Sequence, residues 1–270
     1  MGDVAENRTL WDSKDWPDEG ESWSEWWGDT GALWYGGILP RIHAFVPTGT
    51  ILEIAPGYGR WTHYLRSLCD RLVLVDLSQQ CIDHCSQRFG EDHHIEYFVN
   101  DGRSLDMIED CSLDFVFSFD SLVHAEADVL ESYLGQLRTK LKPEGIGFIH
   151  HSNIGRYRRA IRLARALPPR VMTRLVERGM LPDLIAWRAE SVTAEVFSGL
   201  CERAGLRCVA QEEISWQRGF HLIDTVSVFT PARSGWDRST RHMRNPLLRL
   251  EAARMAGTYS RTSFHHQVNP

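Results

Sequence analysis

The sequence predicts an α/β fold in which helices cover both faces of a mostly parallel sheet. Two observations support it: from residue 50 onward short apolar runs alternate with helical stretches, and two later runs close the pattern as a hairpin. Runs that are apolar throughout are typical of parallel strands buried on both faces. We therefore expect a seven-stranded sheet with a terminal antiparallel hairpin and a helical lid insertion.

The first five strands are expected where short apolar runs are bounded by turn residues. They are Ile51–Ala55, Leu72–Asp76, Ile95–Val99, Leu113–Phe119 and Ile146–His150. The helices expected around them are Arg60–Leu68, Gln79–Phe89, a short piece at Met107–Ile108, and Val129–Leu141. The sequence Lys-Pro-Glu-Gly at 142–145 predicts a turn that ends the last helix before the fifth strand begins.

A basic segment follows the fifth strand. Residues 156–178 hold eight arginines and one acid, and Pro168-Pro169 divides them into two helices. We expect 156–190 to form a basic helical lid insertion. Its charged face is either simply solvated or a wall that recognises an acidic or hydroxyl-rich substrate.

The remaining sequence completes the core and then leaves it. Residues 191–230 predict a helix capped by Ser191 and two strands, Leu206–Trp216 and Leu222–Thr230. Residues 231–270 are polar, with seven arginines and two acids. We expect this C-terminal segment to form an extended arm or a contact in a homo-oligomer.

Tryptophans concentrate at the N-terminus. The first 30 residues hold nine acids and five of the ten tryptophans of the chain. A solvated tail has no need of so many indoles, so we expect 1–47 to dock as a cap on the core domain, 48–155, and to cover a cleft. Ordinary N-terminal packing is the alternative.

Composition excludes several classes of protein. The formal net charge of −6 argues against a general nucleic-acid binder. No run approaches 18 apolar residues and the acidic N-terminus lacks an apolar stretch, so we expect no membrane span and a cytoplasmic protein. None of the six cysteines forms a C-x-x-C pair, and we expect free thiols: Cys69, Cys81, Cys85, Cys111, Cys201 and Cys208.

The strongest motif is the run Ile51–Arg60, ILEIAPGYGR. Glu53 lies in the strand, and the small residues Ala55, Gly57 and Gly59 then let the backbone approach a ligand closely. A dinucleotide would need its pyrophosphate cradled in this turn, but the proline after Ala55 donates no N–H. The ligand is therefore expected to carry a compact group other than phosphate.

Acids follow the next two strands. Asp76 ends the second strand, where a carboxylate can accept hydrogen bonds from ribose hydroxyls. Asp101 and Gly102 follow the third strand and offer an acid and a flexible backbone to an adenine ring. Because parallel strands end at one edge of a sheet, these groups together predict a nucleoside-binding edge.

This arrangement resembles the class I S-adenosylmethionine-dependent methyltransferases, which have a Rossmann-like fold. The resemblance covers about residues 48–152 and also the terminal hairpin at 206–230. Its matching residues include Phe-Ser-Phe-Asp at 117–120 and Leu-Lys-Pro-Glu-Gly at 141–145. It implies that Gly57 faces the methionine part of the cofactor, Asp76 the ribose diol and Asp101 the adenine amino group. Ala55 stands where the family usually has a glycine. The resemblance assigns to the cofactor Glu53, Ala55, Gly57, Gly59, Asp76, Leu77, Asp101, Gly102 and Phe119.

The ends of the fourth and fifth strands predict the transfer site. Asp120 follows the fourth strand and His124 lies one helical turn later, while His150 and His151 end the fifth. A hydroxyl acceptor loses its proton during attack, so a positioned base contributes roughly 10²–10⁴ in rate. We expect His151 as the base, with His124 as second choice and Asp120 as orienter or alternative base.

The same side chains could hold a divalent metal instead. Asp120, His150 and His151 offer mixed oxygen and nitrogen ligands of the kind that suits Mg²⁺. Their spacing matches no recognisable metal motif, so metal dependence remains an alternative to metal-free base catalysis.

Three functions are compatible with these residues. The pattern around the fourth and fifth strands resembles bacterial methyltransferases of carbohydrate metabolism, which implies transfer to a sugar hydroxyl of a small-molecule or oligosaccharide substrate, such as a mannoside precursor of a methylated polysaccharide. The second function is methylation of a phenol or amine of secondary metabolism. The third is a non-catalytic module that only binds the cofactor. Nucleic acid is not expected as substrate, since no base-flipping motif follows the fourth strand.

Overall fold

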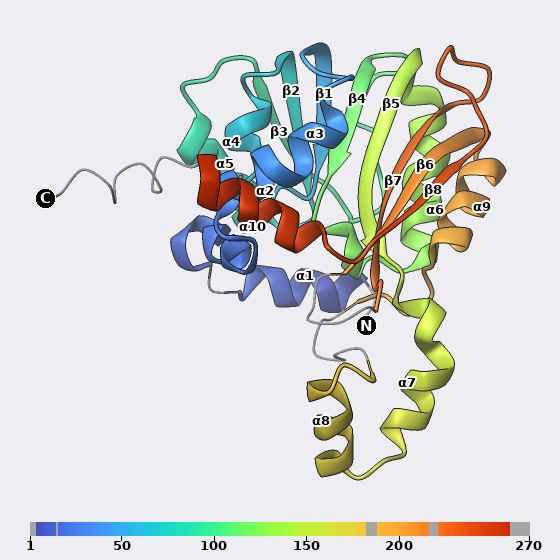
Figure 1. Cartoon of the computed structure of the whole chain (residues 1–270). Coiled ribbons are helices and arrows are strands. Elements are labelled where there is room, and N and C mark those ends of the chain that lie inside the picture. Colours follow the sequence, from blue (N-terminus) through green and yellow to red (C-terminus); the bar gives the residue numbers. More distant parts are fainter. Residues whose placement is uncertain (1–3, 15, 182–187, 216–220, 260–270) are drawn as a thin grey trace, which may run out of the picture.

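The computed structural model describes residues 4–14, 16–181, 188–215 and 221–259, and all that follows concerns these. One eight-stranded sheet runs through the molecule in the order β3-β2-β1-β4-β5-β7-β6-β8 (Figure 1). The strands are β1 (Thr48–Ile54), β2 (Cys69–Asp76), β3 (Ile95–Val99), β4 (Leu113–Ser118), β5 (Leu141–Ser152), β6 (Leu206–Ile214), β7 (Asp224–Pro231) and β8 (Arg241–Asn245).

The pairing confirms the expected mostly parallel sheet. β1 pairs in parallel with β2 and β4, and β2 with β3, and β4 with β5. β7 is antiparallel to both β5 and β6, as expected of the terminal hairpin. The end of the predicted strand Leu206–Trp216 lies outside the described residues, as do residues 217–220 of the hairpin link.

The sheet has eight strands, so the expected number was one too low. β8 pairs in parallel with β6 and comes from the segment expected to be an extended arm. Its sequence, Arg-His-Met-Arg-Asn, contains no apolar run. Such a run is not required here, because four of the five side chains of this edge strand are exposed to solvent. The helix after it packs on the body, so residues 241–259 are part of the fold.

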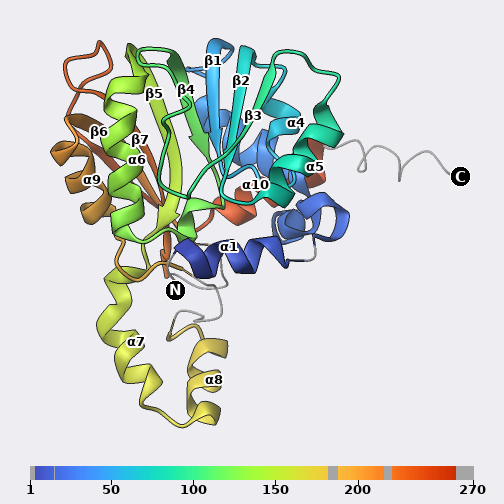
Figure 2. The same ribbon diagram turned by 180° about the vertical axis from the view of Figure 1, so that it is seen from behind.

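Helices cover both faces of the sheet (Figures 1 and 2). Side chains of α6 and α9, such as Leu134 and Phe197, fill one face, and those of α2–α5, η2 and α10, such as Trp34 of η2 and Leu248 of α10, fill the other. The helices are α1 (Val4–Asp12), η1 (Pro17–Trp27), α2 (Thr30–Leu33), η2 (Trp34–Ile38), α3 (Leu39–Ile42), α4 (Thr62–Leu65), α5 (Gln79–Phe89), η3 (Leu122–His124), α6 (Ala127–Lys140), η4 (Ile154–Tyr157), α7 (Arg158–Arg165), α8 (Pro169–Glu177), α9 (Ala194–Arg203) and α10 (Leu248–Tyr259).

Three local expectations were wrong. Residues 142–145 belong to β5, because its pairing with β4 shifts at this point and the chain stays extended through the irregularity. Thr193, and not Ser191, caps α9 by accepting from the backbone N–H of Val196. Residues 107–108 form no helix.

The two segments outside the core lie at the same end of the sheet. Figure 2 shows α1 crossing below the strands, and the pair α7–α8 projecting beyond it. The break between α7 and α8 falls at the two prolines, as expected. None of the described helices combines the length and apolar character needed to cross a membrane. All six cysteines are unpaired, as expected.

Candidate active site

A pocket lies at the carboxyl ends of β1, β2 and β4, the place where open α/β sheets bind their ligands. We call its strand-end side the floor, and the side contributed by the N-terminal cap the roof. The floor residues include Ala55–Tyr58, Asp76, Leu77, Gly102 and Phe119, and the roof residues are Val4, Asn7, Trp11, Trp16, Glu19, Gly20 and Trp23.

The turn after β1 has the backbone conformation that the motif predicts. Ala55, Gly57 and Gly59 have φ of 58°, 58° and 83°. A side chain at Gly59 would collide with Phe89, 2.4 Å from the added Cβ, so glycine is required for packing there. Ala55 takes up a left-handed conformation despite its Cβ, which costs roughly 1–2 kcal/mol. Ala55 and Gly57 line the pocket, whereas Gly59 supports the turn from behind.

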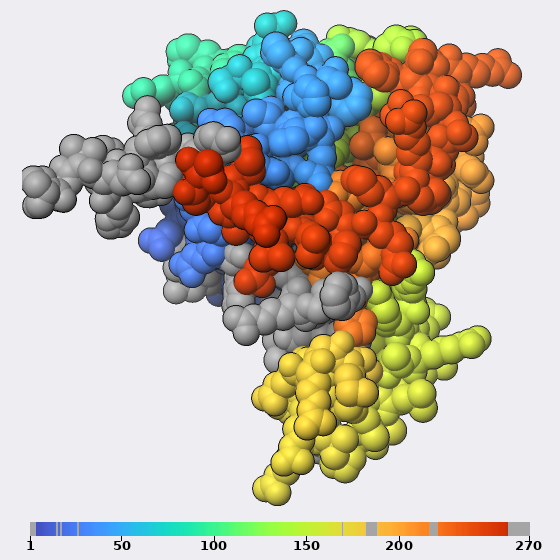
Figure 3. Space-filling view, viewed as in Figure 1, coloured from blue at the N-terminus to red at the C-terminus, as the bar shows by residue number. Residues whose placement is uncertain are grey.

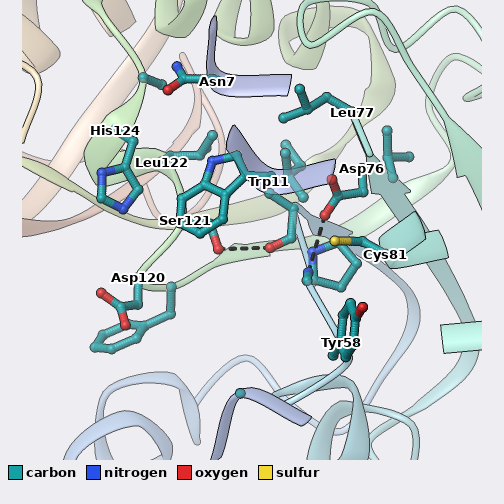
Figure 4. A pocket seen from close by; sticks show the side chains of 18 of the residues that line it. Asn7, Trp11, Tyr58, Asp76, Leu77, Cys81, Asp120, Ser121, Leu122 and His124 are labelled. Carbon is teal, nitrogen blue, oxygen red and sulfur yellow. Dashed lines mark hydrogen bonds between the residues drawn. The ribbon is translucent and has the colours of Figure 1, made fainter. Parts of the chain in front are cut away.

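Asp76 is the acidic residue of the floor (Figure 4). Its carboxylate accepts from the N–H of Gly57 at 3.1 Å and of Ser78 at 2.9 Å. Burial raises the pKa of Asp76 to about 6, although these N–H groups oppose the shift. Leu77 lines the pocket beside it. The motif turn and the acid of the second strand are thus joined in one structure.

Glu53 lies behind the floor and does not line the pocket. Its side chain is buried, and Thr62 donates a hydrogen bond of 2.6 Å to one oxygen. The other oxygen has no hydrogen-bond partner among the described residues. Burial raises the pKa of Glu53 to about 8, with the Thr62 bond opposing the shift.

Of the two residues expected to meet the adenine at the end of β3, only Gly102 lines the pocket. Gly102 lines the pocket with a φ of 83°. The carboxylate of Asp101 is exposed and accepts from the N–H groups of Arg103 and Ser104, so it closes its own loop and does not line the pocket. These bonds, that of Ser104 first, lower the pKa of Asp101. The side chain of Asn100 accepts from the N–H of Gly102 and holds the turn.

Asp120 and His124 form the wall opposite Asp76 (Figure 4). Both side chains are largely buried, and both line the pocket. Asp120 has a φ of 67°, and Arg60 donates to its carboxylate at 2.9 Å. The ring of Phe119, also a pocket residue, packs edge-on against Trp61.

His151, the expected base, is not part of the pocket. Its ring is fully buried and stacks on Phe197 of α9, with centroids 4.1 Å apart. Its Nδ1–H donates to the carbonyl of Ser152, and Nε2 accepts from Ser227. Burial lowers the pKa of His151 to about 3. This histidine is a core residue because successive side chains of β5 point to opposite faces.

His150 lies behind the wall and binds the backbone of Asp120. Its Nδ1 accepts from the backbone N–H of Asp120 at 3.1 Å, and its Nε2 lies 3.5 Å from Asp224. Arg188 donates twice to Asp224, at 2.7 and 3.0 Å, and lies 3.9 Å from Asp120. Burial alone would raise the pKa of Asp224, but Arg188 and His150 hold it below its usual range. Sequence reasoning missed Arg188 and Asp224, which only the fold brings together.

The expected metal ligands do not converge. Among the described residues no group of three or more His, Cys, Asp or Glu side chains could hold a metal ion. Asp120 turns to Arg60, His150 to the backbone of Asp120, and His151 to Ser227. The donor atoms therefore point in different directions, and the metal alternative has no site in this part of the chain.

The roof is built from aromatic side chains. Trp16 stacks on Trp23 and on Tyr58, and a Cβ on Gly57 would lie 2.9 Å from the Trp16 ring. Figure 4 shows Trp11 between His124 and Asp76, and its ring centroid is 5.4 Å from that of His124. Trp11, Trp16 and Trp23 of the N-terminal segment thus cover the pocket, which agrees with the interpretation of this segment as a cap over a cleft.

Polar contacts hold the roof to the floor. Arg8 donates to the carbonyl of Asn100 at 3.0 Å, and Ser78 donates to Asp12 at 2.6 Å. Arg60 donates to Ser24 at 3.1 Å with one nitrogen and to Asp120 with another. Near the end of β3, a Cβ on Gly102 would lie 2.6 Å from Val4. No motif in the sequence indicated these individual contacts of the roof.

The sheet and its covering helices have the Rossmann-like α/β methyltransferase fold. Residues 51–145 match a family model described as a methyltransferase domain. The matched part runs from β1 into β5 and contains the floor and Asp120. The match supports an S-adenosylmethionine-dependent enzyme.

Particular proteins share parts of this chain. Ribosomal RNA small subunit methyltransferase A of Coxiella burnetii is 32% identical over 69 residues, 26% of either chain. Phosphoethanolamine N-methyltransferase 1 of Triticum aestivum is 30% identical over 118 residues, 42% of this chain and 24% of the relative. The chain therefore spans about a quarter of the length of the curated relatives it matches.

Solved structures share the fold over most of the chain. The PH0226 protein of Pyrococcus horikoshii is 20% identical, with a TM-score of 0.56 over 85% of this chain and all of its own. The CcbJ methyltransferase of Streptomyces caelestis is 15% identical, with a TM-score of 0.54 over 81% of this chain and all of its own. At these identities the likeness concerns the fold.

Proposed function

We propose that this protein is an S-adenosylmethionine-dependent methyltransferase acting on a small molecule. One observation carries the proposal: a pocket at the strand ends combines Asp76, Gly57 and Gly102 with a separate wall of Asp120 and His124. A buried carboxylate suits a ribose diol. Trp16 and Val4 of the roof cover the two glycines, which would let an adenosyl group approach the backbone once these two side chains shift. The bound cofactor would supply a methyl group on a positively charged sulfur.

His124 is the base in this proposal, in place of His151. It lines the pocket and belongs to the short helix η3, which directly follows Asp120. A neutral imidazole there can take the proton of an acceptor hydroxyl as the hydroxyl attacks. Asp120 orients the acceptor through its carboxylate, which Arg60 holds in place. His150 positions Asp120 through the backbone.

The finer proposal is a sugar hydroxyl as acceptor, as the sequence led us to expect. The faces of Trp11 and Trp23 can stack on a pyranose ring. Asn7, Glu19 and Asp120 line the same pocket and can hydrogen-bond to sugar hydroxyls.

An amine is the second candidate acceptor. Aromatic rings beside the acids Glu19 and Asp120 are also what a cationic ammonium group prefers. The wheat relative is named for N-methylation of phosphoethanolamine. An amine needs a strong base less than a hydroxyl does, so replacement of His124 would separate the two candidates.

The test is turnover of methyl-labelled cofactor against mannosides, other mono- and oligosaccharides, phenols and amines, with and without a chelator. We expect turnover of a sugar that is insensitive to the chelator. Turnover of only a phenol or an amine would overturn the sugar acceptor. If calorimetry detected no binding of the cofactor or of its demethylated product, the whole proposal would fail.

A further inference from the structure

We propose that the helical pair α7–α8, called the hairpin below, docks on the surface of an anionic lipid membrane. Figure 3 shows the hairpin projecting from the body of the molecule. The turn between the two helices is the part farthest from the sheet (Figure 1). A flat surface can therefore reach the hairpin without touching the body.

Charge is the first observation behind this inference. All eight arginines of residues 156–178 are exposed. Two of them form ion pairs, Arg156 with Glu213 and Arg165 with Glu190. Within the described residues the other six make no ion pair. Since the whole chain has a formal net charge of −6, this basic projection stands out from a molecule that is acidic on balance, and it suits an anionic partner.

Exposed apolar side chains are the second observation. Leu163 is 73% exposed, Leu167 38%, Val171 43% and Met180 62%. Leu163 lies on α7, Leu167 in the turn at the tip of the hairpin, and Val171 in the first turn of α8. The hairpin thus offers apolar side chains among arginines, which is the character of helices that lie in a membrane interface.

The inner face of α7 is already occupied. Ile161 is buried against Ile154 and Ile223, and Ala164 is buried on the same face. The exposed leucines therefore cannot turn inward without breaking this contact. They remain available to a partner that supplies both negative charge and an apolar interior.

An anionic lipid surface fits both features, whereas a nucleic acid fits only one. Phosphate groups of either partner attract arginine, but the nucleic-acid backbone gives Leu163, Leu167 and Val171 nothing apolar to enter. A bilayer takes the apolar side chains into the boundary between headgroups and acyl chains.

A residue that follows the hairpin in the sequence contacts the pocket wall. Ala189 donates its N–H to the carbonyl of Val123 in η3 at 3.0 Å. His124 is the next residue. A docked hairpin would hold the pocket close to the membrane surface, where an amphiphilic acceptor is concentrated.

Vesicle flotation of the full chain tests the inference without cofactor or acceptor, so its result is independent of the methyltransferase proposal. The vesicles are phosphatidylcholine alone, or phosphatidylcholine with about 30% phosphatidylglycerol. We expect binding to the anionic vesicles only, weakened by high salt because salt screens the arginines. Equal binding to both vesicles, or to neither, would overturn the inference.

Two double variants separate charge from insertion. Replacing Arg162 and Arg170 by Glu should weaken partitioning at least about 30-fold, since each basic residue near such a surface contributes about a factor of five. Replacing Leu167 and Val171 by Ser, which changes no charge, should weaken it about tenfold. The matched control is Leu247→Ser with Leu250→Ser, which are 50% and 54% exposed on the body and should leave partitioning unchanged.

A labelled single-stranded RNA is the competing partner in the same assay. If the leucine–valine variant kept full vesicle binding, or if RNA bound more tightly than vesicles at equal phosphate concentration, the hairpin would be a polyanion site and the membrane inference would be wrong. Circular dichroism and thermal melting check that each variant is folded.

Discussion

The floor and the roof of the pocket are built by different means. The floor consists of strand ends and tight turns, with Ala55, Gly57 and Gly102 in left-handed backbone conformations. The roof consists of indole rings on α1 and η1, held by a few polar contacts such as Arg8 to Asn100. Backbone turns fix positions, whereas stacked side chains on short helices can separate as a unit. Under the proposed function, we therefore assign recognition of the ligand to the floor and wall, and its retention to the roof.

The wall should give the largest effect. Replacing His124 by Ala should lower kcat for a hydroxyl acceptor by roughly 10²–10⁴, because the base is lost, while cofactor affinity stays within about threefold. Single-turnover kinetics and calorimetry measure the two quantities. His151→Leu is the matched control: it should lower the melting temperature and leave kcat unchanged, since that ring lies in the core. The opposite pattern would restore His151 as the base.

The floor should come next. Asp76→Ala should weaken cofactor binding on the order of 100-fold, because two hydrogen bonds to a charged carboxylate are lost. Titration calorimetry measures it. The control Asp83→Ala removes a nearby acid of α5 that bonds only to Gln79 of the same helix. A floor that lost nothing with Asp76 would contradict the assigned ribose site.

The roof should matter less for affinity than the floor. Trp16→Ala removes the ring over Gly57 and should weaken cofactor binding about tenfold, mainly through faster dissociation. Stopped-flow measurement of the dissociation rate checks this. Trp236→Ala, a tryptophan 39% exposed and packed against Phe45, is the control. If Trp16→Ala bound the cofactor more tightly, the roof would be a barrier to the ligand.

The pH dependence should be about as large as the effect at the roof. The pKa of Asp76 is raised to about 6, so the carboxylate is ionised above this pH and protonated below it. The ionised form accepts ribose hydroxyls, and cofactor affinity should therefore fall by about tenfold between pH 7.5 and pH 5. Calorimetry at several pH values measures the slope. Asp76→Asn should abolish it, and a slope that survived would have to come from another group.

Local pattern was sufficient to predict the floor. Apolar runs located β1 to β4, and the acid or glycine after each run located the residues that line the pocket, with Gly59 and Asp101 the exceptions. Asp101 differs because its carboxylate closes its own turn, a choice between two local bonding patterns that residue type leaves open.

Long-range contacts were beyond the sequence. Alternation along β5 puts His150 and His151 on opposite faces, but nothing in the run indicates which face meets the pocket. The pairing of Arg188 with Asp224 joins residues far apart in the chain, and the position of Val4 over Gly102 depends on how the cap docks. β8 went unrecognised because its stability comes from pairing with β6 and not from its own apolar residues.

Arg60 links the N-terminal cap to the wall of the pocket. Its guanidinium lies over the Trp61 ring, 4.5 Å from the centroid, while one nitrogen reaches Ser24 and another reaches Asp120. If the cap moved away, Arg60 would lose its hydrogen bond to Ser24, and the surroundings of the guanidinium that binds Asp120 would change. By thermodynamic reciprocity, a molecule whose binding strengthens the contact between Arg60 and Asp120 also stabilises the closed position of the cap, by the same free energy. Occupancy by one reactant would in this way be communicated to the entrance used by the other.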